Sequence, residues 1–305
     1  MKRWGNSKAL TRASYGLVKE HPGMNRWTVR AAVHGAIVGG LGTLIGLGVV
    51  GVGTGMSDSS DGGALGTLVL VLGALIVALG LIGGLTAANR QLAGLVRVTD
   101  DVLHGREPDE AAARAAAHSR LGALTAWSAI SVAVGALVAF IRGDGDSGII
   151  TSVVRSLLAG LVAAVWAVVT TMVLPVIVLE QLGAVPAIKR SAGIIRSTWG
   201  EAVFGSVRIG ARFFLTYSLP GLLLVAGGIA LSIIVGGPVI GLGVVLALAG
   251  VVLIVVGAVK AATCRNVFGV ALYRWATGEG ALGPFSDDDL RGAVNVKGVR
   301  SSVPA

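Results

Sequence analysis

One polar stretch between two apolar ones contains most of the candidate binding residues of this sequence. Residues 179–205 read LEQLGAVPAIKRSAGIIRSTWGEAVFG, and their spacing predicts a short amphipathic helix over 186–199. Its apolar face consists of Ile188, Ala192, Ile195 and Trp199, and its basic side chains are Lys189, Arg190 and Arg196. A basic amphipathic helix can bind anionic lipid headgroups. We therefore predict that the three basic residues and Trp199 contact lipid headgroups or a protein partner.

Two isolated charges are the other candidates for a functional role. Glu180 ends an apolar stretch within reach of Lys189 or Arg190, and we expect an interface ion pair there rather than a proton carrier. Arg155 is the one charge that could lie inside a span, where an ionisable residue is a functional hypothesis. Because residues 157–178 alone are long enough to cross, we favour the outer interface for Arg155, with its side chain reaching water. The intramembrane position is the alternative.

The sequence carries no recognisable catalytic or metal-binding motif. Its four histidines are scattered without ligand spacing, and its single cysteine, Cys264, excludes an intrachain disulfide and a thiolate metal cluster. Zinc-protease and Walker patterns are absent, and no arrangement of Ser, His and Asp suggests a triad. We therefore expect no catalytic residue, no metal site and no cofactor.

The sequence predicts that these residues are held by membrane-spanning helices. Of the 305 residues 54% are hydrophobic and 13% charged, whereas a soluble domain carries about 25% charged residues. A span needs about 20 apolar residues, and six stretches qualify: 33–55, 63–87, 121–141, 157–178, 213–235 and 239–261. Pro175 and Pro220 interrupt the fourth and fifth stretches and predict helix kinks. The predicted fold class is all-α, a polytopic integral membrane protein with six transmembrane helices.

The positions of the basic residues predict the topology. The net charge is +9, and all 25 Lys and Arg residues except Arg142 and Arg155 lie in segments on one side of the six spans. The positive-inside rule then places both termini in the cytoplasm. It also explains the positive net charge, so we do not expect nucleic acid as a partner.

Three short helical stretches precede the first, third and fifth spans, at 8–19, 108–120 and 186–199. They suggest three hairpins, each with a cytoplasmic interfacial helix. The alternative is that there is no repeat, because any membrane protein built of helical hairpins needs basic cytoplasmic loops. We assign residues 1–276 to the transmembrane domain and residues 277–305, which are rich in small and acidic residues, to a flexible cytoplasmic tail.

Two segments resemble a known family. The stretch VLPVIVLEQLGAVPAIKRSAGIIRSTWGEAVFG, followed later by ALYRWATGEG, is similar to the uncharacterised prokaryotic multi-pass membrane family catalogued as domain of unknown function 6159. The matching positions are Pro175, Glu180, Gly183, 187–191, 198–201 and 273–278. The chain departs from the family pattern at Ala184 and Pro186. The resemblance implies an integral membrane protein and lends no activity.

Three classes of function are compatible with these observations. The favoured one is a non-enzymatic protein of the bacterial cell membrane, an accessory or organising subunit. Its partners would be membrane lipid with anionic cytoplasmic headgroups, and a membrane protein or a second copy of the chain. The alternatives are a transporter or channel for a small solute, and a lipid-directed membrane enzyme. The absence of a visible site favours the first, because function must be argued from a site.

Overall fold

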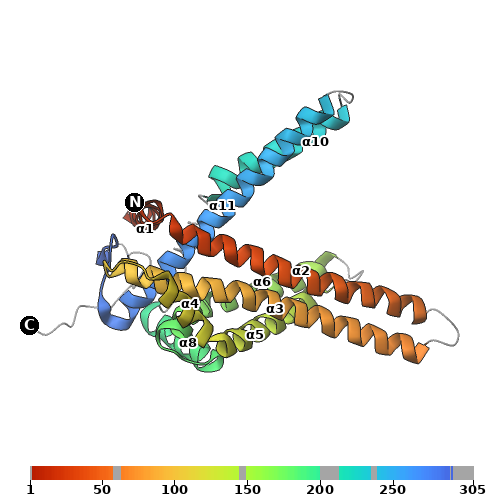
Figure 1. Ribbon diagram of the computed structural model, residues 1–305, viewed down its shortest axis with the longest axis horizontal. Coiled ribbons are helices and arrows are strands. Elements are labelled where there is room, and N and C mark those ends of the chain that lie inside the picture. The colour runs from red at the N-terminus through yellow and green to blue at the C-terminus, as the bar shows by residue number, and fades with distance from the viewer. Residues whose placement is uncertain are drawn as a thin grey trace, which may run out of the picture. The chain divides into compact units, whose positions relative to one another are not determined.

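The computed structural model describes residues 2–57, 63–143, 149–199, 213–234, 239–288 and 290. Within these ranges the chain is helical and contains no strand. It forms two compact units, and Figure 1 labels most of the helices. Unit 1 comprises Met1–Thr28, Thr99–Arg106 and Arg196–Ala305, and unit 2 comprises Val29–Val98 and Glu107–Ile195.

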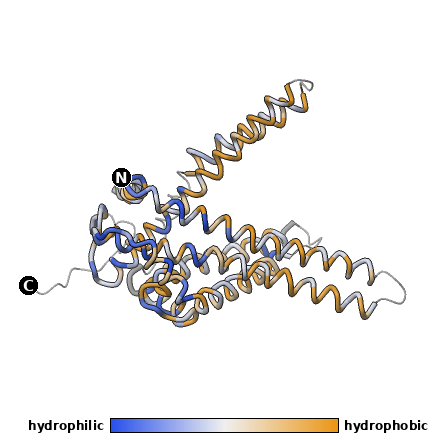
Figure 2. Tube along the Cα trace, in the orientation of Figure 1, coloured by the Kyte–Doolittle hydropathy of each residue, from blue (hydrophilic) through white to orange (hydrophobic). Residues whose placement is uncertain are grey.

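Five of the described helices are long and apolar enough to cross a membrane, so the chain is a multi-pass membrane protein. Their large apolar side chains are exposed, for example Leu44 at 68% and Ile234 at 80%, and Figure 2 shows the apolar residues along their length. The five are α2 (Gly23–Ser57), α3 (Gly63–Leu103), α5 (Leu121–Arg142), η1 with α10 (Phe214–Ser218 and Leu219–Ile234), and α11 (Ile240–Arg274), which continues into η3 (Trp275–Glu279).

The prediction of six spans is not confirmed, because the fourth predicted stretch is not one continuous helix. It is divided between α6 (Ile149–Val169) and α7 (Val173–Leu179), and the apolar part of α6 is the shorter Thr151–Ala167. At the break, Thr170 and Thr171 donate their hydroxyls to carbonyls of the last turn of α6, at 2.7 and 2.8 Å. Pro175 lies in the first turn of α7, where its missing N–H has no helical partner to lose.

Pro220 follows a local widening of its helix. Residues Phe214–Ser218 form a π-helical turn, in which the Leu219 N–H donates to the Phe214 carbonyl. The next residue is Pro220, which has no N–H to continue an α-helical ladder. The wide turn accommodates that missing donor, and ordinary α-helix resumes through Ile234.

Within unit 2, α2 and α3 pack antiparallel through glycines. An ideal Cβ on Gly42 would lie 2.5 Å from the Cα of Gly80, and one on Gly84 would lie 2.5 Å from the Cα of Gly39. These distances leave no room for side chains, so the two backbones touch. In unit 1, α10 and α11 approach each other in the same way at Gly228, whose Cβ would lie 2.4 Å from the Gly243 carbonyl.

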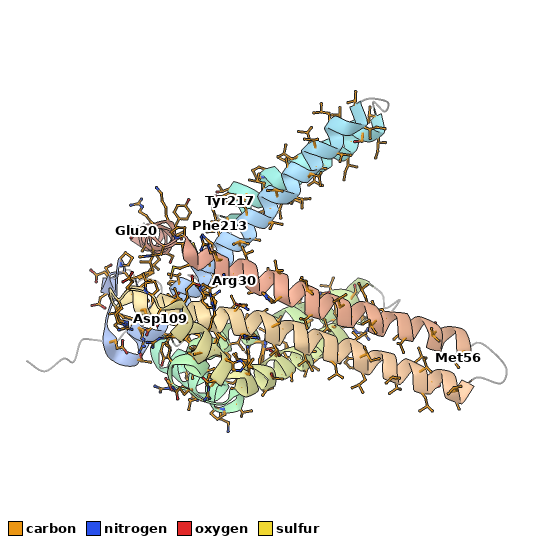
Figure 3. All side chains as sticks on the ribbon, viewed as in Figure 1. Glu20, Arg30, Met56, Asp109, Phe213 and Tyr217 are labelled. Carbon is orange, nitrogen blue, oxygen red and sulfur yellow. The ribbon has the colours of Figure 1, made fainter. Side chains whose placement is uncertain are left out.

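Helices α3 and α11 are longer than a membrane requires. The 41 residues of α3 extend over about 60 Å, roughly twice the hydrocarbon thickness. Their ends contribute to the core of unit 1 together with α1 (Lys2–Glu20), a core whose largest buried side chains include Met24 and Trp27. Thr28 and Thr263 share a buried hydrogen bond of 2.8 Å there, and Figure 3 shows Phe213 and Tyr217, whose rings stack at 5.9 Å.

The segment predicted as a flexible tail begins with a packed stretch. Phe285 is 5% exposed and Leu290 0%, and Trp275 Nε1 donates to Asp287 Oδ1 at 2.9 Å. Residues 291–305 lie outside the described ranges. The three predicted short helices are present as α1, α4 (Glu110–Ser119) and α8 (Ala184–Trp199).

Candidate functional site

The turn between α7 and α8 brings together the polar residues that the sequence singled out. Arg190 Nε donates to both carboxylate oxygens of Glu180, at 3.0 and 3.1 Å. Arg190 thus forms an ion pair with Glu180, and Lys189 is exposed beside it. The pair joins the end of α7 to the first half of α8. Both side chains are partly in solvent, so the ion pair itself contributes little to stability.

Helix α8 packs on its own protein through a face of mostly small side chains. The buried residues are Ala184, Ala187, Ser191 and Ile194, which recur at three- and four-residue intervals. Ser191 Oγ donates to the Val169 carbonyl at the end of α6, at 2.5 Å. The predicted apolar stripe lies beside this face, because Ile188, Ala192 and Ile195 are half-buried. Lys189, Arg190 and Arg196 are exposed, and the side chain of Trp199 lies outside the described residues.

Arg120 ties the start of α5 to the same turn. Its Nη2 donates to the Gln181 carbonyl and, at 3.0 Å, to the Leu182 carbonyl. Gln181 has φ +56°, a left-handed conformation that is uncommon for a residue other than glycine. The two carbonyls follow the end of α7, where no further helical turn supplies donors. The guanidinium therefore replaces backbone donors and holds the turn in shape.

We expect Arg120→Gln to lower the free energy of unfolding by about 1.5 kcal/mol, because two carbonyls lose a charged donor. Unfolding of the purified protein by SDS in mixed micelles would measure the change. Arg114→Gln is the matched control, since Arg114 is exposed on α4 and pairs across one helical turn with Glu110, at 2.7 Å. Equal effects of the two substitutions would contradict a special role for Arg120.

Helix α4 is positioned by its first residues. Asp109 Oδ1 accepts from the N–H groups of Ala111 and Ala112, at 2.8 and 3.0 Å, which caps the helix. Glu110 lies 3.9 Å from Arg30 of α2. Asp109 and Arg30 are labelled in Figure 3. The cap confirms a helix start near the predicted residue 108.

A second polar site, which we call the carboxylate–arginine cluster, was not predicted from the sequence. It consists of Asp100, Asp101, His104, Arg106, Arg274 and Glu279, all within unit 1. At its centre the Asp100 carboxylate is 1% exposed. One oxygen accepts from Arg274 Nε at 2.7 Å and the other from Arg106 Nη2 at 3.3 Å. Two guanidinium groups thus pair with this buried carboxylate, and the Arg274 contact joins the end of α3 to the end of α11.

The outer part of the cluster extends these contacts. Arg106 Nε donates to Asp101 at 3.0 Å, and Arg274 Nη1 donates to Glu279. His104 Nε2 lies 3.1 Å from Glu279 Oε2. The signal in the sequence was the pair of adjacent acids near the end of a long, mostly apolar helix. Their partner Arg274 lies 174 residues further along the chain, so only the fold brings them together.

Arg155 lies within α6, and its side chain is exposed. Its guanidinium reaches the end of α5, because an ideal Cβ on Gly143 would lie 3.1 Å from Arg155 Nη1. A cation is favourable at the carbonyl end of a helix. Arg142 occupies the last turn of the same helix.

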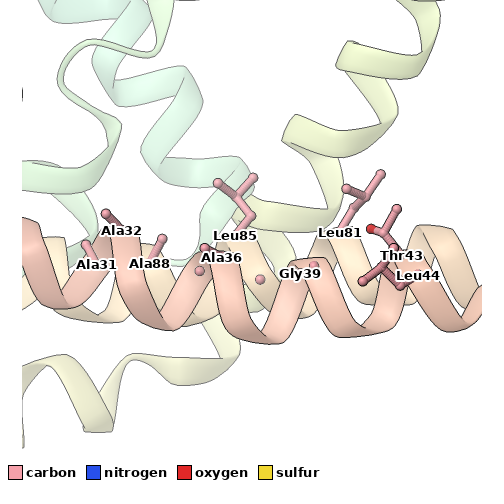
Figure 4. A pocket seen from close by; sticks show the side chains of 12 residues that line it. Ala31, Ala32, Ala36, Gly39, Thr43, Leu44, Leu81, Leu85 and Ala88 are labelled. Atoms are coloured by element: carbon pink, nitrogen blue, oxygen red, sulfur yellow. The ribbon is translucent and has the colours of Figure 1, made fainter. Parts of the chain in front are cut away.

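A groove of about 610 Å³ runs between α2 and α3 on unit 2 (Figure 4). Small residues line most of it, among them Gly35, Gly39, Gly84 and Ala88. Thr43 supplies a hydroxyl (Figure 4). The groove exists because glycine and alanine leave the space that larger side chains would fill.

A family model described as a family of unknown function, DUF6159, matches residues 87–283, which is more than half of the chain. The chain belongs to the DUF6159 family. The residues matched to DUF6159 include both polar sites, the turn held by Arg120 and the cluster that contains Asp100 and Glu279. Most of the glycine contacts between α2 and α3 involve residues that precede the matched range. Comparisons with curated proteins and with solved structures give no match.

Proposed function

We propose that this DUF6159 protein is a non-enzymatic integral membrane protein that organises anionic lipid at the cytoplasmic face of a bacterial cell membrane. The proposal rests on the two different faces of α8, one packed on the protein and one basic and exposed. Its small residues pack on the protein, and Lys189, Arg190 and Arg196 point away from that packed face. A helix fixed in this way presents its charges as part of a folded surface.

The supporting structure is built to hold α8 in place. Ser191 anchors the middle of the helix to α6, and Arg190 anchors it to Glu180. Arg120 fixes the turn from which it starts. The half-buried Ile188 and Ile195 lie between the packed and basic faces, where they can meet the acyl boundary while the basic groups reach the headgroups. An accessory role, in which bound lipid or a membrane protein is held beside the spans, follows from this arrangement.

The topology that accompanies the proposal has six spans as three hairpins and both termini in the cytoplasm. Helix α6 serves as the additional span, since its 21 residues extend over about 31 Å. The α7–α8 turn and the other basic segments then share the cytoplasmic side, in keeping with the positive-inside rule. The short helices α1, α4 and α8 lie at that interface, one before each hairpin.

We expect the double variant Lys189→Gln/Arg196→Gln to bind phosphatidylglycerol about 30-fold more weakly, since each basic group near anionic headgroups contributes about 1 kcal/mol. Both side chains are exposed and form no part of the packed face of α8. Titration of the purified full-length protein with phosphatidylglycerol in mild detergent, followed by native mass spectrometry, would measure the change. Phosphatidylcholine provides the zwitterionic comparison.

The control is Arg142→Gln/Arg155→Gln, which removes the same charge near the other end of α5. It should leave phosphatidylglycerol binding within about twofold of wild type, because the change lies outside the proposed lipid site. An equal loss in both double variants would show that overall charge alone attracts the lipid. If neither variant loses affinity, α8 does not contact headgroups, and its basic face is open to a protein partner instead.

A further inference from the structure

Lys260 is the first charged residue of α11, and it follows a long apolar stretch. The helix carries no charge from Ile240 to Val259, and this stretch extends over about 30 Å, the thickness of the hydrocarbon core of a bilayer. A span that begins at Ile240 therefore reaches the opposite boundary of the hydrocarbon at Lys260. Its ammonium group falls at the level of the lipid phosphates.

Tyr217 lies beside Lys260 and holds its ammonium group in place. Lys260 Nζ donates to Tyr217 Oη at 3.3 Å. Tyr217 belongs to the π-helical turn η1, and its ring stacks on Phe213 (Figure 3). Its Cβ rests on the backbone of α11, because an ideal Cβ on Gly257 would collide with it. The glycine thus lets the tyrosine approach α11 about one turn before Lys260.

The groups that this site leaves available are hydrogen-bond donors. An ammonium group has three N–H donors and no acceptor, and Lys260 uses one of them on Tyr217. The Tyr217 oxygen accepts that bond, so its own hydrogen can be donated to a further group. In the part of the chain that the structure describes, no carboxylate lies within ion-pair distance of Lys260. A positive charge beside an O–H donor is a combination that binds phosphate oxygens.

We propose that Lys260 and Tyr217 form a binding site for the phosphate of an anionic phospholipid. The ammonium group pairs with the phosphate charge, and the tyrosine hydroxyl donates a second hydrogen bond. The acyl chains lie along α11, where Val256 and Val252 are exposed one and two turns before Lys260. This apolar surface next to the donors favours a lipid over a free phosphate ion. The site shares no residue with α8, so it does not depend on the function proposed for that helix.

Labelling of individual lysines in the full-length protein tests the site. The protein in phosphatidylcholine bicelles is treated with an amine-reactive reagent, and labelled peptides are quantified by mass spectrometry. Added phosphatidylglycerol should protect Lys260, because a bound phosphate covers its ammonium group. Lys19, which is exposed on α1, reports the general effect of anionic lipid on labelling and should be protected much less. Inorganic phosphate should not protect Lys260, and protection equal to that by phosphatidylglycerol would overturn the lipid as the ligand.

Tyr217→Phe tests the hydroxyl, since it keeps the ring that stacks on Phe213 and removes only the O–H. Half-protection of Lys260 should then need about fivefold more phosphatidylglycerol, as expected for the loss of one hydrogen bond. Tyr15→Phe is the matched control, because its ring also lies beside Phe213, 6.4 Å between centroids, and it should leave that concentration unchanged. Equal shifts in the two variants, or no protection of Lys260 by phosphatidylglycerol in the wild type, would overturn the site. Lys189 on α8 is measured in the same digest, so the two lipid sites are tested separately.

Discussion

Asp100→Asn is expected to lower the free energy of unfolding by about 3 to 5 kcal/mol, the largest effect of any substitution considered for this protein. The Asp100 carboxylate is almost completely buried and accepts from both Arg106 and Arg274. The amide keeps the shape of the side chain but removes the charge that both guanidinium groups need. Arg274 is itself partly buried, so it would be left with a reduced counter-charge in a partly desolvated position.

The effect of Asp100→Asn can be measured by SDS-driven unfolding in mixed micelles. Glu110→Gln is the control, because it removes a carboxylate from exposed ion pairs on α4, and should change the free energy of unfolding by at most about 1 kcal/mol. A small effect of Asp100→Asn, similar to that of the control, would mean that the cluster is solvated. The cluster would then contribute little to joining α3 and α11.

Gly42→Leu is expected to lower the free energy of unfolding by about 3 kcal/mol, because it would separate two helices that touch through their backbones. Even a Cβ at this position would lie 2.5 Å from the Cα of Gly80, a contact that no rotamer can relieve. The helices must move apart locally and lose the neighbouring contacts at Gly39 and Gly84. The same unfolding measurement would detect this loss.

Gly48→Leu is the matched control on the same helix. Nothing lies within 4 Å of an ideal Cβ at Gly48, and the position is exposed. Leucine also has the higher helix propensity, so this variant should be neutral or slightly more stable than wild type. If both variants are equally destabilised, the cost comes from the loss of glycine itself and the packing of α2 on α3 is not the cause.

Local sequence patterns determined much of the architecture. Apolar runs of about 20 residues predicted the membrane helices, because in lipid each helix must satisfy its own backbone. A short helix was predicted over 108–120, and the structure has α4 at Glu110–Ser119, capped by Asp109. The basic residues of α8 were predicted to lie off its apolar face, and in the structure they are exposed. These features depend on neighbours within a few residues along the chain.

Hydropathy did not predict the break in the fourth stretch. Averaged over 157–178, two threonines and one proline change the apolar character very little. The break depends on individual hydrogen bonds of Thr170 and Thr171 and on the missing N–H of Pro175. Hydropathy also ended the predicted stretch 63–87 before the first charges, whereas α3 continues to Leu103. A helix does not end at the membrane boundary when protein covers its next turns.

The class of the protein, its apolar helices and the basic character of α8 can therefore be predicted from local residue patterns. Which faces of those helices are covered depends on packing between distant segments. Small residues such as Ala187 and Ser191 carry little apolar signal, yet they form the packed face of α8, because close approach of backbones needs small side chains. The carboxylate–arginine cluster likewise joins Asp100 to Arg274 across 174 residues. Such pairing has no local signature, because the energy that stabilises it arises only when the folded chain buries both charges together.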